Sequence, residues 1–393
     1  MTESNEYGES INLHQERAGK IEITSKVDVT SEEDLSVVYT PGVSAVCRAI
    51  AEDETKVNTL TARGNMIAVI TDGTAVLGLG DIGPKAAIPV MEGKSILFKK
   101  LANVDAFPIS LDTKDTEEII SIIKALQPNF SGINLEDISA PRCFEIEKRL
   151  IEELDIPVFH DDQHGTAIVV LAALINALKV VDKSDKDAKI IINGAGSAGI
   201  AIAKLLLEAG CQNITLVSLE GILNKSEEWL NDAQRDIAEY TNFDNVQGTL
   251  EDVIKDADVF IGVSGPKALS KEHVQSMNND PIIFALANPT PEIYPEEAYE
   301  AGAAIVGTGR SDYPNQINNL LAFPGIFRGV LDAKTQHITT EMKIAAAKAI
   351  AATIHKDELN ANYVIPNSLE KRVVDQVAAS VQQCVENKTE ILV

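Results

Sequence analysis

Residues 191–200 read IINGAGSAGI, an apolar strand pattern that runs into a glycine-rich turn and then into a helical pattern. The glycines allow a tight turn and let a pyrophosphate approach backbone N–H groups at the positive end of the helix. A GxGxxG pattern alone is weak evidence and fits a purely structural turn, but here further strand patterns follow it. We therefore predict a dinucleotide-binding loop, formed by Gly194, Ala195, Gly196, Ser197, Ala198 and Gly199.

The residue expected to bind the adenosine ribose is not the usual one. An acid about 20 positions after the glycine loop commonly binds the ribose 2′-OH of NAD. The next strand pattern, residues 214–217, is followed by Ser218 instead. Ser218 does not repel the 2′-phosphate of NADP, yet no Arg follows to bind one, although Lys225 is available. Glu220 is a candidate for a displaced acid, so the sequence leaves the choice between NAD and NADP open.

Strand and helix patterns alternate on both sides of this loop, which predicts parallel strands joined by right-handed crossovers. Before the loop, strands are expected at residues 66–70, 106–111, 132–135 and 156–159, and helices at 116–126 and 144–154. From the loop onward, strands are expected at residues 189–193, 214–217, 259–264, 282–287 and 304–307. The predicted fold class is α/β with two doubly wound domains, the second a Rossmann-type dinucleotide-binding domain.

The domain division follows from two neighbouring segments. The nearly all-apolar helix pattern at residues 165–179 predicts a helix buried between two layers, and the polar stretch 181–189 separates the two series of strands. C-terminal helices with Ala-rich faces are expected to pack back on the first domain. The expected division is 1–163, including a polar arm at 1–35 that contacts a partner subunit, then 164–335 for NAD(P) binding and 336–393 for the helical segment.

Composition excludes several kinds of partner. Against 34 Lys and Arg stand 59 Asp and Glu, a net charge of −25, which argues against binding to nucleic acid or to an anionic membrane. We find no apolar run of the roughly 20 residues that a transmembrane helix needs, and the polar N-terminus does not resemble a signal peptide. Four scattered cysteines without a CxxC pair fit free thiols in a reducing compartment. We expect a cytoplasmic protein.

Carboxylates follow the third and fourth strand patterns. Glu136 and Asp137 come after the third, and Asp161 and Asp162 come after the fourth. Ligands of parallel sheets collect beyond the carboxyl ends of the strands, so four carboxylates should meet there. Like charges so close need a cation or a shared proton, and oxygen ligands suit Mg²⁺ or Mn²⁺. The alternative is that these acids cap the helices that follow.

Four other side chains are candidates. Lys94 lies among apolar residues in PVMEGKSILFKK, and a buried lysine beside a cation would have a lowered pKa and could act as a general base. Tyr39 precedes a rigid Thr-Pro-Gly turn, Asn288 ends a strand pattern, and Asn318 lies in NQINN. Taken singly, each of them favours a structural role, as do the histidines beside the aspartate pair.

Together these segments resemble the malic enzyme family in its short bacterial form. The motifs, in that family's order, are VYTPGV, TDGTAVLGLGDIGP, MEGKSILFK, NLEDIS, FHDDQHGTA, NGAGSAG, ALANPTPE and GTGRSDYPNQINNLLAFPGIFRG. They run from about residue 35 to residue 332, and several are long enough to be specific.

The resemblance implies a role for each candidate. Tyr39 matches the general acid and Lys94 the general base, with Asp161 beside them in the active site. The metal ligands match Glu136, Asp137 and Asp162. Asn288 and Asn318 match positions that contact cofactor and substrate, Lys94 also contacts the substrate, and Ser218 stands where NAD-preferring members often have an acid.

The implied activity is oxidative decarboxylation of (S)-malate to pyruvate and CO₂, with reduction of NAD or NADP and with Mg²⁺ or Mn²⁺. The family forms homo-oligomers, so we expect at least a dimer. The sequence leaves open whether Tyr39 serves its own subunit or the partner. A malolactic enzyme would release lactate instead, although its chain is usually longer. A metal-independent 2-hydroxy-acid dehydrogenase would lack the carboxylates, Lys94 and Tyr39. A non-catalytic dinucleotide sensor would keep only the glycines.

Overall fold

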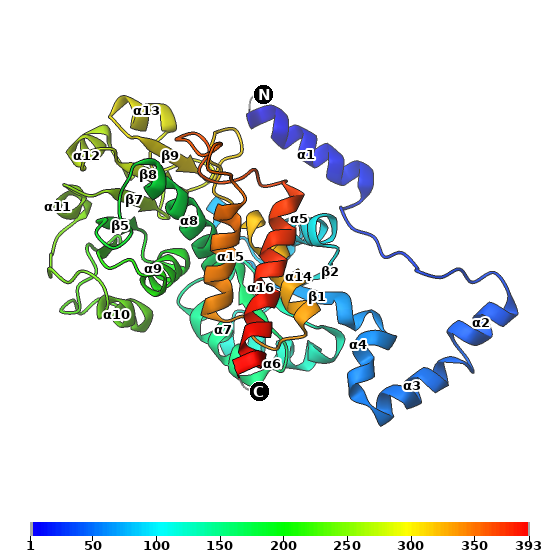
Figure 1. Cartoon of the computed structure of the whole chain (residues 1–393). Coiled ribbons are helices and arrows are strands. Elements are labelled where there is room, and N and C mark those ends of the chain that lie inside the picture. The colour runs from blue at the N-terminus through cyan, green and yellow to red at the C-terminus, as the bar shows by residue number, and fades with distance from the viewer. Residues whose placement is uncertain (1–2, 392–393) are drawn as a thin grey trace.

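The computed structural model describes residues 3–391, most of which fold around two parallel sheets (Figure 1). The first sheet has the strand order β2-β1-β3-β4. Its strands are β1 (Met66–Thr71), β2 (Asp105–Ser110), β3 (Ile133–Leu135) and β4 (Val158–His160). They are connected by α5 (Pro84–Ala102), α6 (Thr116–Leu126) and α7 (Arg142–Glu153). The predicted first sheet is confirmed, with bounds that differ by a few residues.

The second sheet has the order β6-β5-β7-β8-β9, and all neighbouring strands are parallel. The strands are β5 (Ile190–Asn193), β6 (Ile214–Val217), β7 (Val259–Gly262), β8 (Ile282–Ala285) and β9 (Ile305–Thr308). The helices are α9 (Ser197–Ala209), α10 (Asp232–Ala238), α11 (Leu250–Ile254), α12 (Lys271–Ser276) and α13 (Pro295–Glu300). Two parallel sheets, the second of Rossmann type, confirm the predicted fold class.

One helix, α8 (Asp161–Val180), lies in the hydrophobic core that both domains share. It is long and apolar enough to cross a membrane, which the sequence pattern alone did not indicate, but 72% of its most apolar stretch is buried inside the protein. We therefore interpret it as a core helix. It begins four residues before the predicted helix, so that Asp161 and Asp162 lie in its first turn. The following residues pack against α9 and α15 (Thr340–Ala352).

In the C-terminal segment, the last helix packs back on the first domain, as expected, whereas α15 packs against α8 and α9. Helices α14 (Phe323–Ala333) and α16 (Lys371–Ile391) both contact α5. The ring of Phe98 on α5 lies 4.6 Å from the ring of Phe323 and 5.3 Å from that of Phe327, measured between centroids. Short 3₁₀ helices occur at Glu54–Lys56, Ala62–Asn65, Leu77–Leu79, Gln127–Asn129 and Asn319–Leu321.

The N-terminal arm is longer than the predicted 1–35, and beyond its first helix it extends away from both sheets (Figure 1). It comprises α1 (Glu3–Arg17), α2 (Glu32–Val38), α3 (Val43–Glu52) and α4 (Val57–Leu60). Within the described chain, α2, α3 and α4 contain no buried residue. Apolar side chains stay exposed there, including Ile23 at 89% and Val37 at 68%. The arm therefore has no hydrophobic core of its own. The outermost residues of the expected arm and C-terminal segment, 1–2 and 392–393, lie outside the described structure.

Candidate active site and metal centre

Three carboxylates meet where β3 and β4 end. Glu136 and Asp137 directly follow β3, and Asp162 lies in the first turn of α8, directly after β4. The two strands are parallel neighbours, so their carboxyl ends lie at one edge of the sheet. One oxygen from each of the three carboxylates lies within 4.8 Å of the other two. The structure thus brings together the three residues that the sequence suggested as metal ligands.

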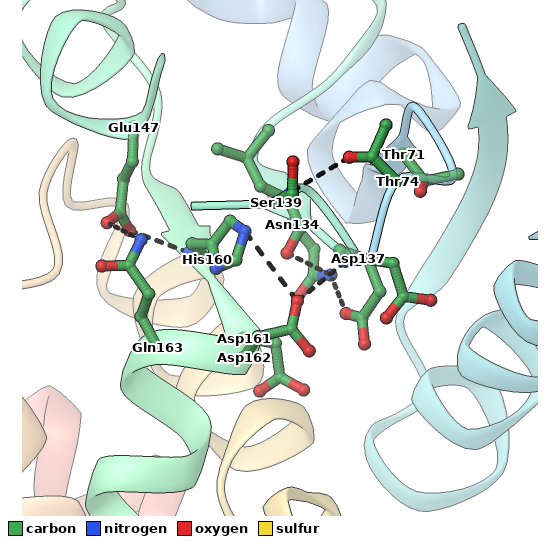
Figure 2. A network of polar contacts seen from close by, with 12 residues as sticks. Thr71, Thr74, Asn134, Asp137, Ser139, Glu147, His160, Asp161, Asp162 and Gln163 are labelled. Atoms are coloured by element: carbon green, nitrogen blue, oxygen red, sulfur yellow. Dashed lines mark hydrogen bonds and ion pairs between the residues drawn. The ribbon is translucent and has the colours of Figure 1, made fainter. Parts of the chain in front are cut away.

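Backbone geometry orients this cluster. Asp137 has a left-handed φ of +56°, and its N–H donates to Asp162 Oδ2 at 2.8 Å (Figure 2). Its carbonyl accepts from Ala75 N–H at 2.9 Å. Neither α7 nor α8 has a side-chain cap at its N-terminus. The capping alternative is therefore wrong for Glu136 and Asp137, while the first-turn position of Asp162 is favoured by the helix dipole.

Burial makes the cluster electrostatically unfavourable without a cation. It raises the pKa of Asp137 to about 9, and the carboxylates of Asp162 and Glu136 add to this shift. It also raises the pKa of Glu136 to about 7, although Lys94 pulls in the other direction. In the described part of the chain, Asp137 Oδ2 is buried without a hydrogen-bond partner. An oxygen-only donor set with a free buried oxygen fits a hard divalent cation such as Mg²⁺ or Mn²⁺.

We predict that Asp137→Asn stabilises the metal-free protein. A carboxyl group whose folded pKa is raised, to about 9 here, costs stability above its unfolded pKa of about 3.9. The metal-free parent should therefore lose stability as pH rises between those two values. At pH 8, D137N should melt roughly 2–4 °C higher than the parent and gain less from Mn²⁺. The control is Asp112→Asn at an exposed position, and equal responses of the two variants to pH and Mn²⁺ would contradict the metal-site assignment.

Lys94 lies between two of the acids. From α5, its Nζ contacts Asp161 Oδ2 at 2.5 Å and Glu136 Oε1 at 2.9 Å, and it lies 4.1 Å from the centre of the Phe323 ring. Burial by itself lowers the pKa of Lys94, but the two carboxylates outweigh it and the pKa is raised. The lowered pKa that we expected assumed a neighbouring cation, whereas carboxylates surround Lys94 in this structure.

Asp161 positions the lysine. It is fully buried, and its Oδ2 accepts from both Lys94 Nζ and the Asn319 amide. Sequence reasoning selected Asn318 but missed its neighbour Asn319. Nothing in the NQINN motif distinguishes the asparagine that reaches Asp161 from the one whose Oδ1 accepts from Leu320 N–H.

A cavity of about 900 Å³ joins the residues of both domains. The predicted residues that line it are Lys94, Glu136, Asp137, Asp162, Ser197, Ala198, Asn288 and Asn318. Arm residues Ser10, His14 and Lys20 also line it, and no sequence signal indicated them. Lys20, just after α1, holds this part of the arm beside the cavity, because its Nζ donates to Pro89 O at 2.7 Å.

The glycine loop lies at the carboxyl end of β5. Gly194 has a φ of +122° and donates its N–H to Val217 O at 2.8 Å. A Cβ at Gly199 would lie 1.7 Å from Gly194 O, so only glycine allows α9 to begin this close to the turn. The loop thus has the tight geometry predicted for a dinucleotide-binding turn.

The candidate ribose site follows the neighbouring strand. Ser218 comes directly after β6, which pairs with β5. Its Oγ donates to Glu220 Oε2 at 2.7 Å, and this hydrogen bond lowers the pKa of Glu220. The Glu220 carboxylate is therefore held ionised beside the position where the sequence lacked an acid.

Tyr39 does not belong to this site within one chain. It ends α2 on the arm, its side chain is 66% exposed, and it is not among the described residues that line the cavity. Of the catalytic candidates, the structure brings together Lys94 and Asp161 and leaves Tyr39 apart.

The two histidines beside the aspartates, His160 and His164, both contact the buried Glu147, and Figure 2 shows His160 and Glu147. His160 N–H donates to Glu147 Oε1 at 2.8 Å, and His164 Nε2 lies 2.9 Å from Glu147 Oε2. The His160 ring lies next to the cluster, with Nε2 3.8 Å from Asp162 Oδ2. Burial lowers the pKa of His160 to about 4, so the ring is neutral near pH 7. These contacts are structural ones.

A Rossmann-type domain whose glycine loop shares one cavity with a buried lysine and a carboxylate cluster defines the class of protein as a dinucleotide-dependent oxidoreductase. Two family models match, "Malic enzyme, N-terminal domain" over residues 18–151 and "Malic enzyme, NAD binding domain" over residues 163–386. The chain belongs to the malic enzyme family.

Individual relatives of known sequence or structure belong to the same family. The NAD-dependent malic enzyme of Geobacillus stearothermophilus is 61% identical over 92% of this chain and 76% of its own length. The bifunctional malic/malolactic enzyme of Bacillus subtilis is 58% identical over 95% of this chain and 91% of its own length. The crystal structure of an NAD-dependent malic enzyme from Thermotoga maritima superposes with a TM-score of 0.92 at 50% identity, covering 95% of this chain and 98% of the other.

Proposed function

We propose that this protein converts (S)-malate to pyruvate and CO₂ while reducing NAD, with Mg²⁺ or Mn²⁺ at the Glu136–Asp137–Asp162 cluster. The observation that carries this proposal is the shared cavity, in which Lys94 and the carboxylates of the first domain face the dinucleotide loop of the second. Membership of the malic enzyme family supports the same reaction. We further propose that the protein works in the cytoplasm.

In this reaction, each residue of the site has its own role. When bound, a divalent cation would supply a Lewis acid for the C2 oxygen of malate, and NAD would supply the hydride acceptor. Asp161 and Glu136 raise the pKa of Lys94 and hold its Nζ in place. With the Glu136 charge offset by a bound cation, Lys94 would reach the neutral form in which it takes the proton of the C2 hydroxyl. Asn288 and Asn318 line the same cavity, where their amides can orient the carboxylates of the substrate.

Protonation of C3 after the loss of CO₂ needs an acid, and we propose that the partner subunit's Tyr39 provides it in a homodimer. Two observations support this. Tyr39 is exposed and outside the cavity of its own chain, and the arm that carries it exposes apolar side chains that a second copy would cover. The arm begins beside the cavity, at Ser10 and His14, and then extends away from it.

A malolactic reaction is the second candidate. The relative from Bacillus subtilis, whose name includes this activity, is matched over 91% of its length. Chain length, which we expected to count against this activity, therefore does not separate the two reactions. The product separates them, because the malolactic reaction forms lactate without net release of reduced cofactor.

The test is malate-dependent reduction of NAD and of NADP, with and without Mn²⁺, with pyruvate and lactate measured separately. We expect Mn²⁺-dependent reduction and an equal amount of pyruvate. Accumulation of lactate without reduced cofactor would identify the malolactic reaction. No turnover with either cofactor would favour a dinucleotide sensor.

We predict that Glu220 makes the enzyme prefer NAD. Its carboxylate can accept a hydrogen bond from the ribose 2′-OH and would repel the 2′-phosphate of NADP. Glu220→Gln should lower kcat/KM for NAD by about tenfold and leave kcat/KM for NADP unchanged or higher. The matched control is Glu239→Gln, an exposed glutamate in the same domain. If E220Q and E239Q show the same ratio of kcat/KM for NAD to kcat/KM for NADP, Glu220 does not determine the cofactor preference.

A further inference from the structure

A second cavity, of about 1090 Å³, shares no lining residue with the active-site cavity. It lies where α7 of the first domain meets α9 and α10 of the second, with the start of α15 on its border (elements labelled in Figure 1). Helix α8 separates it from the catalytic cavity, since Asp162 and Thr166 line one cavity and Gln163 and His164 line the other. The proposed reaction makes no use of this space.

The walls of the second cavity are largely apolar. Phe144 and Ile151 from α7 and Leu205 from α9 line it. Tyr240 and Phe243, which follow α10, also line it and are 58% and 68% exposed. Such a concave space with aromatic side chains favours a ligand with an apolar or aromatic body.

One cation in the wall makes no direct ion pair, although the charge of Glu147 acts on it and raises its pKa. Lys343 lies in the first turn of α15, and among residues 3–391 its Nζ makes no hydrogen bond or ion pair. The nearest acid, Glu147, already accepts from His160 N–H and contacts Gln163 and His164. Burial lowers the pKa of Lys343 to about 8, which leaves the amine mostly charged near pH 7. A half-buried ammonium group of this kind is stabilised by an incoming carboxylate.

The other charged side chains that line this cavity do not form a second anion-binding position. Lys204 pairs with Asp236 at 2.8 Å, and Lys148, Glu152 and Glu208 are exposed side chains at the border. These five side chains carry two positive and three negative charges, so they do not favour a polyanion such as a nucleotide or a polyphosphate. The cavity combines apolar walls with one cation that makes no direct ion pair.

We propose that this cavity is a second ligand site, which binds a monocarboxylate with an apolar or aromatic body. The carboxylate pairs with Lys343, and the body lies against Phe144, Ile151 and Leu205. The site is coupled to the metal centre, because Gln163 and His164 in its wall are the next residues along α8 after Asp162. Through Glu147, this wall also contacts His160, whose ring lies beside Asp162.

Titration calorimetry of the full-length protein with 3-phenylpropanoate tests the binding. Neutral 3-phenylpropanamide and acetate serve as controls that lack the charge and the apolar body, respectively. We expect only 3-phenylpropanoate to bind saturably. Its affinity should fall about tenfold or more in Lys343→Met and be largely retained in Lys343→Arg. Lys348→Met, at an exposed lysine on the same helix, is the matched control. The Met variant removes a half-buried charge that makes no direct ion pair, so it should fold at least as stably as the parent.

Binding that K343M leaves unchanged, or no binding at all, would overturn the proposal. Complete displacement of the probe by malate in the presence of Mn²⁺ would also overturn it, because it would place the probe in the catalytic cavity, whereas coupling between two sites changes the affinity only by a limited factor. The coupling is tested by titrating Mn²⁺ with and without saturating probe, where we expect its affinity to change about fivefold; an unchanged affinity would refute the coupling. None of these measurements requires turnover, so the proposed reaction can fail without affecting the result.

Discussion

Lys94→Met should lower malate oxidation by about 10³-fold, because the variant has no group at this position to accept the C2 hydroxyl proton. Met has nearly the same length, so the apolar part of the side chain can still pack against Phe323. The measurement is the steady-state reduction of NAD with saturating malate and Mn²⁺. The matched control, Lys99→Met, lies on the same helix and loses a surface ion pair with Asp105 and a hydrogen bond to Asn103, so it should stay near parent activity.

Loss of activity in K94M has to be separated from loss of structure. Removing one partner of a buried ion pair commonly costs about 3–5 kcal/mol, and Lys94 has two such partners. The melting temperature with and without Mn²⁺ should therefore be measured alongside. A folded K94M that binds NAD and oxidises malate within tenfold of the parent rate would show that Lys94 is not the base.

Tyr39→Phe should lower pyruvate formation by about 10²-fold or more while sparing the reduction of added oxaloacetate, since only the decarboxylation route needs a proton at C3. Tyr39 is exposed in its own chain, so the loss of one hydroxyl should not alter the fold. The control is Tyr7→Phe, an exposed tyrosine of the same arm. If Y39F forms pyruvate at the parent rate, the acid assignment is wrong.

Mixing the two inactive variants tests where Tyr39 acts. Random exchange of Y39F and K94M subunits makes half of the dimers mixed, and exchange across the interface gives each mixed dimer one site with both Lys94 and Tyr39. About one quarter of the parent activity should then return. If Tyr39 served its own subunit, every site in the mixture would lack one residue and no activity would return.

Much of the fold could be predicted from the sequence because local patterns determine it. The helix predicted at residues 116–126 has those bounds in the structure, since its apolar spacing and the capping Asp115 agree. The carboxylate cluster was predictable for a similar reason, because parallel strands place their carboxyl ends at one edge. The start of α8 was not, because Asp161 and Asp162 read as loop residues by composition although they occupy the first helical turn.

The remaining features depend on contacts between distant segments. The raised pKa of Lys94 follows from Asp161, which lies 67 residues away along the chain. The presence of Ser10 and His14 in the cavity follows from the path of the arm, which no local periodicity determines. The separation of Tyr39 from Lys94 is likewise a property of that path.

The uncovered arm gives enzyme concentration a direct influence on catalysis. If each active centre takes its acid from another molecule, dilution below the dissociation constant of the dimer removes an acid from every centre at once. Specific activity should then fall as the assay is diluted, and pyruvate formation should fall earlier than oxaloacetate reduction, which does not need that acid. Rates measured at very low enzyme concentration would describe an incomplete catalyst, and the partial reactions would show which part was missing.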